Sequence, residues 1–326
     1  MGRAATGLAA VTVLSLTASG CVTVHGELEV VPAATRTEAA QALKDFTDAY
    51  NKADKAYDPA LDAGRVTGAL GAINQAGLRA RHVTTPGGNP QHRPLELTDA
   101  KFYVPKKAGW PRFFLADTDS NRDVDSGGQD SRWLVMFVRN GNDQLWEAAY
   151  LAILTPDEMP KFRTDKDGWA EPVAPDAATT AVAPRDLSEE YASYLQSGKP
   201  EHFADGAHTS EWRDLRKQNE RRPGLSTQYV DQPLDTGDFA PLGLVTDDGG
   251  ALVFFAMRYF DRQTAAQGYR PKVGADVKAL MTGQVKSTLT KEWMSSQAVR
   301  VAPRGGSGPA VTVVGRLQGV TSATGS

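Results

Sequence analysis

The sequence contains a single cysteine, Cys21, among its 326 residues, so no disulfide bond can form within the chain. It also lacks the short motifs of common nucleophiles, zinc hydrolases and phosphate-binding loops: Gly-x-Ser-x-Gly, Ser-x-x-Lys, His-Glu-x-x-His and a phosphate-binding glycine loop. Neither sign of charge is in clear excess, since 36 basic residues oppose 39 acidic ones. These absences favour neither catalysis nor binding to nucleic acid.

The N-terminus has the pattern of an export signal. Arg3 supplies a positive charge, and an apolar stretch over residues 4–17 follows, which is too short to span a bilayer as a helix. Small residues at positions 18–20 then precede Cys21. No later apolar run reaches the length of a transmembrane helix. The pattern predicts that residues 1–20 are a signal peptide.

This signal resembles that of signal-peptidase-II substrates, the bacterial lipoproteins. The resemblance implies that Cys21 is the first residue of the mature chain and carries a diacylglyceryl group, with fatty acids such as palmitate. Two acyl chains, at about 0.8 kcal/mol per buried methylene, give durable attachment to membrane lipid. We therefore expect the mature chain on the extracytoplasmic face of the cell membrane. The alternatives are an ordinary secretory signal with an incidental cysteine, or a buried thiol in a cytosolic protein.

The first half of the mature chain is predicted to be an α+β domain. Residues 21–34 alternate apolar and polar side chains and form a membrane-proximal tether or strand. Thr35-Arg36-Thr37-Glu38 has the spacing of a capping box, and apolar residues then recur at helical intervals until Asp58-Pro59. A second, weaker helical pattern covers residues 61–80. Strand patterns follow at 95–104, 112–116, 132–139 and 145–154, and we place the domain at 35–163.

The second half repeats this order. Residues 164–184 are rich in Ala, Pro, Thr and Asp, lack periodicity and are predicted to be an interdomain linker. The second domain, 185–326, opens with two helical patterns that end at Gly198 and Pro223. Strand patterns follow at 225–234, 243–246, 251–261, 288–301 and 310–323, with glycine-rich hairpin turns at 247–250 and 304–308.

The predicted fold class is therefore α+β, with two tandem domains that arose by duplication or are unrelated. The element order resembles the cone-shaped fold of nuclear-transport-factor-like and cystatin-like proteins, in which helices pack into the concavity of a bent antiparallel sheet. In such a cone, Phe46 and Tyr50, and later Tyr191 and Leu195, would point into the concavity. With the N-terminal signal and a composition heavy in Ala, Arg and Gly, the chain also resembles the uncharacterised lipoproteins of actinobacteria.

An acidic segment offers a candidate calcium site. Asp117, Asp119, Asn121, Asp123 and Asp125 place oxygen donors at alternate positions, as calcium loops do. The sixth and twelfth positions, which an EF-hand fills with glycine and glutamate, hold Arg122 and Gly128. A solvated acidic hairpin loop explains the same residues.

A second polar cluster offers candidate zinc ligands: Glu201, His202, Asp205, His208 and Glu211. The two histidines are six residues apart, which no standard zinc helix motif uses. A polar loop leading to a helix N-cap at Thr209, with Glu211 in the first turn, explains the same residues.

The sequence supports no assignment of a catalytic, cofactor or metal residue. Its aromatic residues, among them Trp133, Trp146 and Trp212, are expected mainly in the core rather than on a sugar-binding platform. We therefore predict a non-catalytic binding module of the cell envelope, whose partner is an envelope protein or a cell-wall ligand. The alternative is an envelope enzyme or a carrier of a small ligand that uses the concave face of a sheet.

Overall fold

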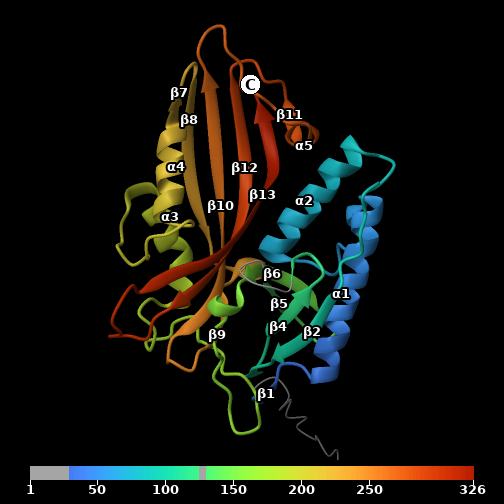
Figure 1. Ribbon diagram of the computed structural model, residues 1–326, viewed down its shortest axis with the longest axis vertical. Coiled ribbons are helices and arrows are strands. Elements are labelled where there is room, and N and C mark those ends of the chain that lie inside the picture. The colour runs from blue at the N-terminus through green and yellow to red at the C-terminus, as the bar shows by residue number, and fades with distance from the viewer. Residues whose placement is uncertain (1–28, 125–129) are drawn as a thin grey trace, which may run out of the picture.

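The computed structural model describes residues 29–124 and 130–326, so Cys21 and the predicted signal lie outside the described residues. The fold is mixed α+β with several sheets (Figure 1). The described helices are α1 (Arg36–Ala56), α2 (Gly68–Thr84), α3 (Leu187–Ser197), α4 (Ser210–Glu220) and α5 (Ala275–Ala279). The described strands are β1 (Val31–Pro32), β2 (Leu97–Tyr103), β3 (Lys106–Lys107), β4 (Arg112–Ser120), β5 (Arg132–Arg139), β6 (Glu147–Leu154), β7 (Arg221–Arg222), β8 (Leu225–Leu234), β9 (Leu242–Val245), β10 (Ala251–Ala265), β11 (Met281–Gly283), β12 (Thr288–Val301) and β13 (Val311–Gly325).

The capping box at the start of α1 is confirmed. The backbone N–H of Glu38 donates to Thr35 Oγ1 at 3.1 Å, and the N–H of Thr35 donates to Glu38 Oε2 at 2.7 Å. The next helix, α2, begins later than the glycine-rich pattern indicated. Its preceding residues are held extended, because Val66 bridges Ala148 and Thr67 donates a backbone hydrogen bond to the same residue at 3.0 Å.

The strands form two main sheets. The first half supplies an antiparallel sheet of order β2-β4-β5-β6. The second half supplies a seven-stranded sheet of order β11-β13-β12-β10-β8-β7, to which β9 adds beside β10. The predicted hairpins between β5 and β6, between β9 and β10 and between β12 and β13 are confirmed.

The central strands of both sheets are buried on two faces, which differs from the cone prediction. Strands β4 and β5 carry unbroken buried runs, and such runs are typical of strands covered on both sides. One face of this sheet packs on α1 through Phe114 and Phe137. From its other face, Met136 joins Phe254 and Ala298 of the seven-stranded sheet in one core. Of the helices, only α2 reaches this shared core among the described residues, through Ala69 and Ile73, while α1 and α3 pack on other faces of the sheets. Two tandem cone domains are therefore not confirmed.

The seven-stranded sheet curls into a half-barrel, and α3 packs on its far face (Figure 1). Register shifts in the β12–β13 ladder at Glu292/Trp293 and at Ala298/Val299 contribute to this curvature, because bulges increase the local twist. The helix α2 contacts both β6 and β13, so it lies where the two sheets meet.

The segment 164–184, expected as a linker, is attached to both halves. Ala170 donates a backbone hydrogen bond to Val104 at 2.9 Å, and Val173 donates one to Gly243 at 3.1 Å. Val182 is 4% exposed in the core beneath α3. The segment thus has packing partners of its own, and the predicted domain boundaries stay a prediction.

Candidate functional site

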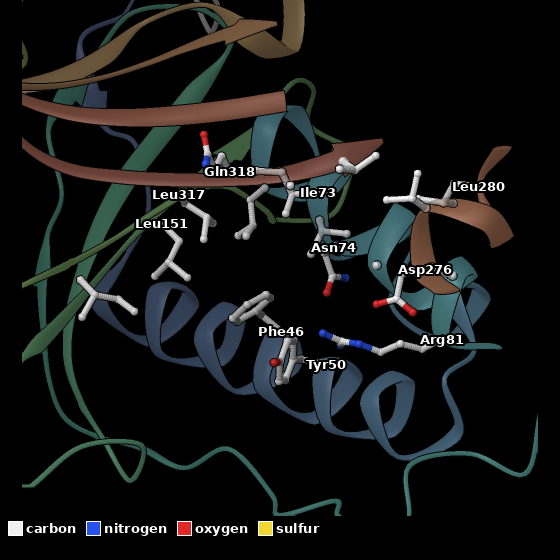
Figure 2. Close-up of a pocket in the computed structure, with 18 of the residues that line it drawn as sticks. Phe46, Tyr50, Ile73, Asn74, Arg81, Leu151, Asp276, Leu280, Leu317 and Gln318 are labelled. Atoms are coloured by element: carbon white, nitrogen blue, oxygen red, sulfur yellow. The ribbon is translucent and has the colours of Figure 1, made fainter. Parts of the chain in front are cut away.

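A cleft of about 580 Å³ opens between α1, α2, α5, β13 and the edge of the four-stranded sheet (Figure 2). We call it the α2 cleft. Its walls are mostly apolar and include Phe46, Leu70, Ile73, Trp133, Leu151 and Leu317. Ile153 at its border is 48% exposed, so the cleft is open to solvent. Its volume lies within the range of about 300–1,000 Å³ that is usual for sites of small ligands.

Two glycines explain why this space exists. A Cβ at Gly319 of β13 would come within 2.8 Å of Ile73 Cγ2, so the missing side chain lets α2 pack closely on the sheet. A Cβ at Gly77 of α2 would meet nothing within 4 Å, although Gly77 lines the cleft. Gly319 therefore lets α2 approach the sheet, and Gly77 leaves the adjacent space open as part of the cleft.

The floor of the cleft is built by α1. Phe46 is 3% exposed and packs edge-on against Phe137 of β5, with ring centroids 5.8 Å apart. Tyr50, one turn later, is half-buried and lines the cleft. The corresponding residues of the second half, Tyr191 and Leu195, are buried in the core between α3 and the seven-stranded sheet. The α1 face is therefore not fully covered by its sheet, in contrast to the filled concavity that the cone resemblance implied.

The charged groups of the cleft lie at one end, and the polar residue Gln318 lies at the other, where its Oε1 accepts a hydrogen bond from the Tyr259 hydroxyl (Figure 2). Figure 2 shows the Arg81 side chain reaching towards Tyr50 and Asn74, with Asp276 of α5 close by. The Arg81 guanidinium lies over the Tyr57 ring, with its carbon 5.7 Å from the ring centroid. Among the described residues, neither Arg81 nor Asp276 has an ion-pair partner within 4.0 Å.

The buried Asp62 carboxylate holds the Asn74 side chain at the charged end of the cleft. Asn74 Nδ2 donates to Asp62 Oδ2 at 2.6 Å, and Gln75 Nε2 donates to Asp62 Oδ1 at 2.5 Å. Burial raises the pKa of the Asp62 carboxyl, and these two hydrogen bonds oppose that rise. Burial also raises the pKa of the Tyr50 phenol, so it stays protonated at neutral pH and can donate a hydrogen bond.

The sequence predicted that Phe46 and Tyr50 point into a concavity, and both line the cleft, but it did not indicate the other residues of the site. Trp133 was assigned to the core, and its side chain lines the cleft instead. Arg81 and Asp276 come from elements nearly two hundred positions apart, and the short helix α5 was not predicted. The available signal was the glycine content of α2, which by itself predicts only a weaker helix.

The acidic segment does not converge on a common point within the described residues. Asp117 is 4% exposed and accepts a 2.7 Å hydrogen bond from Arg132 Nε. Asp119 accepts from the backbone of Ser120, and Asp123 accepts from the hydroxyl of Ser131. Asp125 lies outside the described residues.

The candidate zinc ligands are likewise engaged separately. His202 Nδ1 lies 2.7 Å from Glu190 Oε2 of α3, and Glu201 pairs with Lys199. Burial lowers the pKa of the His208 imidazole. Across residues 29–124 and 130–326, no group of three or more His, Cys, Asp or Glu side chains is arranged to hold a metal ion.

The same part of the chain contains no helix that is long and apolar enough to cross a membrane.

Comparison with known proteins gives close relatives without an assigned activity. A family model described as a domain of unknown function, DUF8094, matches residues 30–325. An uncharacterised lipoprotein of Streptomyces coelicolor is 56% identical over 318 residues, covering 97% of this chain and 94% of the relative. An uncharacterised lipoprotein of Streptomyces avermitilis is 53% identical over 325 residues, covering 99% of this chain and 96% of the relative.

Proposed function

The chain belongs to the DUF8094 family, and from this premise we propose that it is a membrane-anchored lipoprotein that binds a small apolar ligand in the α2 cleft. The names of the two Streptomyces relatives and the Cys21 signal support the anchor. Acylated Cys21 would hold the protein to membrane lipid on the extracytoplasmic face. Ligand binding corresponds to the alternative function that the sequence leaves open, a carrier of a small ligand.

The observation that carries this proposal is the apolar lining of an open cleft. Exposed apolar side chains that line a concave surface gain free energy when a ligand removes them from water, at about 25 cal/mol per Å². The lining residues come from both halves of the chain, including Leu151 of β6 and Leu317 of β13. The packing of the two halves against each other therefore maintains the site.

The polar groups of the cleft suit recognition better than catalysis. Its titratable side chains are Tyr50, Arg81 and Asp276, all at one end. Hydrolytic chemistry needs a nucleophile in hydrogen-bond contact with a base, and no such pair occurs among these three. Such groups can instead orient a ligand whose apolar part lies deeper in the cleft.

A direct test uses phenylnaphthylamine, a neutral dye whose fluorescence rises in apolar surroundings. The full chain should increase the dye's fluorescence in a saturable way. Gly77→Phe should reduce this binding at least tenfold, because its ring would occupy open cleft space. Gly87→Phe is the matched control, since a Cβ at Gly87 also meets nothing within 4 Å but lies outside the cleft.

The outcomes are distinct if both variants keep the circular dichroism spectrum of the wild type. Loss of dye binding in Gly77→Phe alone supports the cleft as the ligand site. Equal binding by both variants and the wild type, or no saturable binding by any of them, would overturn the proposal.

A further inference from the structure

The α2 cleft has an amphipathic lining, which restricts the class of ligand beyond its apolar part. Leu151, Leu317 and Trp133 line the apolar region. Arg81 is the one cation among the residues that line the cleft, and Asp276 is the one carboxylate. Both lie with Tyr50 and Asn74 at the same end (Figure 2). A ligand that matches this lining needs an apolar chain at one end and a polar headgroup at the other.

The Arg81 guanidinium is available to such a headgroup. No ion pair within 4.0 Å engages it among the described residues, and the Tyr57 ring supports its carbon at 5.7 Å. The Tyr57 carbonyl is in turn contacted by His82 Nδ1 at 3.1 Å, which ties the end of α1 to α2. A guanidinium presents its donors in a planar fork that matches the oxygens of a phosphate or carboxylate.

The Asp276 carboxylate adds a second requirement. A headgroup with negative charge alone would be attracted by Arg81 and repelled by Asp276. A headgroup that also has hydroxyl groups can donate hydrogen bonds to Asp276 while its anionic oxygens face Arg81. Asn74 and the protonated Tyr50 phenol offer further hydrogen bonds at this end.

We infer that the ligand is a single-chain anionic amphiphile whose phosphate headgroup carries hydroxyl groups, as in a monoacyl phosphoglycerol lipid. This inference rests on the proposed function and specifies the ligand of the same cleft. The volume of about 580 Å³ lies within the range of about 300–1,000 Å³ that is usual for sites that hold one small ligand. The chain would lie against Leu151 and Leu317, and the phosphate would bind Arg81.

The experiment measures displacement of phenylnaphthylamine from the full chain by four compounds, each below the concentration at which it forms micelles. Monoacyl phosphatidylglycerol has the chain, the phosphate and the free hydroxyls. Monoacyl phosphatidic acid lacks the terminal glycerol, monoacylglycerol lacks the phosphate, and glycerol phosphate lacks the chain. We expect the first compound to bind most tightly and glycerol phosphate not to displace the dye.

Variants assign the headgroup contacts. Arg81→Gln should weaken binding of monoacyl phosphatidylglycerol about tenfold or more, and should leave monoacylglycerol within about twofold. Arg79→Gln is the matched control, because Arg79 lies on the same helix and lines a neighbouring depression instead of the α2 cleft. Asp276→Ala should reduce the preference for the glycerol headgroup over monoacyl phosphatidic acid.

Failure of this inference can be distinguished from failure of the proposed function. If the dye and monoacylglycerol bind but Arg81→Gln leaves the affinity for the anionic lipids unchanged, the headgroup assignment is wrong and the apolar site stands. If glycerol phosphate displaced the dye as strongly as monoacyl phosphatidic acid does, the cleft would bind phosphate without using an acyl chain. That result would also overturn the inference. If neither the dye nor any lipid binds, the proposed function itself is wrong.

Discussion

Ile73 of α2 lies directly over Gly319 of β13, so closely that a Cβ at position 319 would come within 2.8 Å of Ile73 Cγ2. This contact sets how near α2 approaches the curled sheet. Since α2 also contacts β6, the same contact fixes the helix between the two sheets and defines the back of the α2 cleft.

The first prediction compares two identical substitutions. Gly319→Ala should lower the free energy of unfolding by about 1–3 kcal/mol, because the branched Ile73 side chain cannot move away without shifting α2. Gly77→Ala should instead raise it by about 0.5–1 kcal/mol, because the added methyl meets nothing and alanine favours the helix. Urea denaturation measures both, and a change of the same sign in both variants would contradict this account.

The second prediction concerns the floor of the cleft. Phe46→Ala should lower the free energy of unfolding by about 3–5 kcal/mol, since Phe46 is 3% exposed and packs against Phe137. Tyr50→Phe, one turn along α1, should stay within about 0.5 kcal/mol of the wild type because it removes only a hydroxyl. If Phe46→Ala left the melting temperature unchanged but abolished ligand binding, Phe46 would be a ligand contact rather than a core residue.

The third prediction concerns a buried ion pair on the far face of the seven-stranded sheet. Arg216 Nη1 lies 2.8 Å from both carboxylate oxygens of Asp231, and the rings of Tyr229 and Tyr259 flank its guanidinium. Asp231→Ala should lower the free energy of unfolding by about 3–5 kcal/mol, because it leaves a buried charge without its partner.

A double variant tests the reason for that loss. Arg216→Met combined with Asp231→Leu should recover most of the stability, since neither charge is then buried. A double variant as unstable as Asp231→Ala alone would show that packing, rather than the unpaired charge, causes the loss.

The fourth prediction is a pH dependence that originates at His208. Burial lowers the pKa of this imidazole, with a further contribution from Arg316. Since the unfolded chain has the ordinary pKa of about 6.5, the folded state binds the proton less well. The contribution of His208 to stability is therefore present above about pH 6.5 and is lost as the pH falls through the folded pKa.

Comparison of the wild type with His208→Gln isolates this effect. Between about pH 7.5 and pH 5.5, urea denaturation should show a larger loss of unfolding free energy in the wild type than in the variant. Parallel curves for the two proteins would exclude His208 as the source.

The fifth prediction concerns the membrane anchor. Cys21→Ser should abolish labelling by a fatty-acid analogue and release the protein from the membrane fraction, because the acylated sulfur is lost. Equal labelling of the wild type and the variant would contradict the lipoprotein proposal.

Local sequence patterns were enough to predict several local features of the structure. The capping box at Thr35 and Glu38 and the hairpin turns depend on contacts between neighbouring residues, so their patterns could be read without the fold. The export signal ending at Cys21 is likewise a local pattern, and it gave the expectation of membrane attachment.

Which surfaces meet could be seen only in the folded structure, because it depends on contacts between distant parts of the chain. The unbroken apolar run around Met136 indicates a strand covered on both faces, but it does not say that the partner is Phe254 of the other sheet. In the same way, Arg81 and Asp276 have no sequence signal as a pair, because α2 and α5 are far apart in the chain and become neighbours only in the folded structure. The α2 cleft depends on long-range packing of segments from both halves, and for that physical reason local sequence patterns could not reveal it.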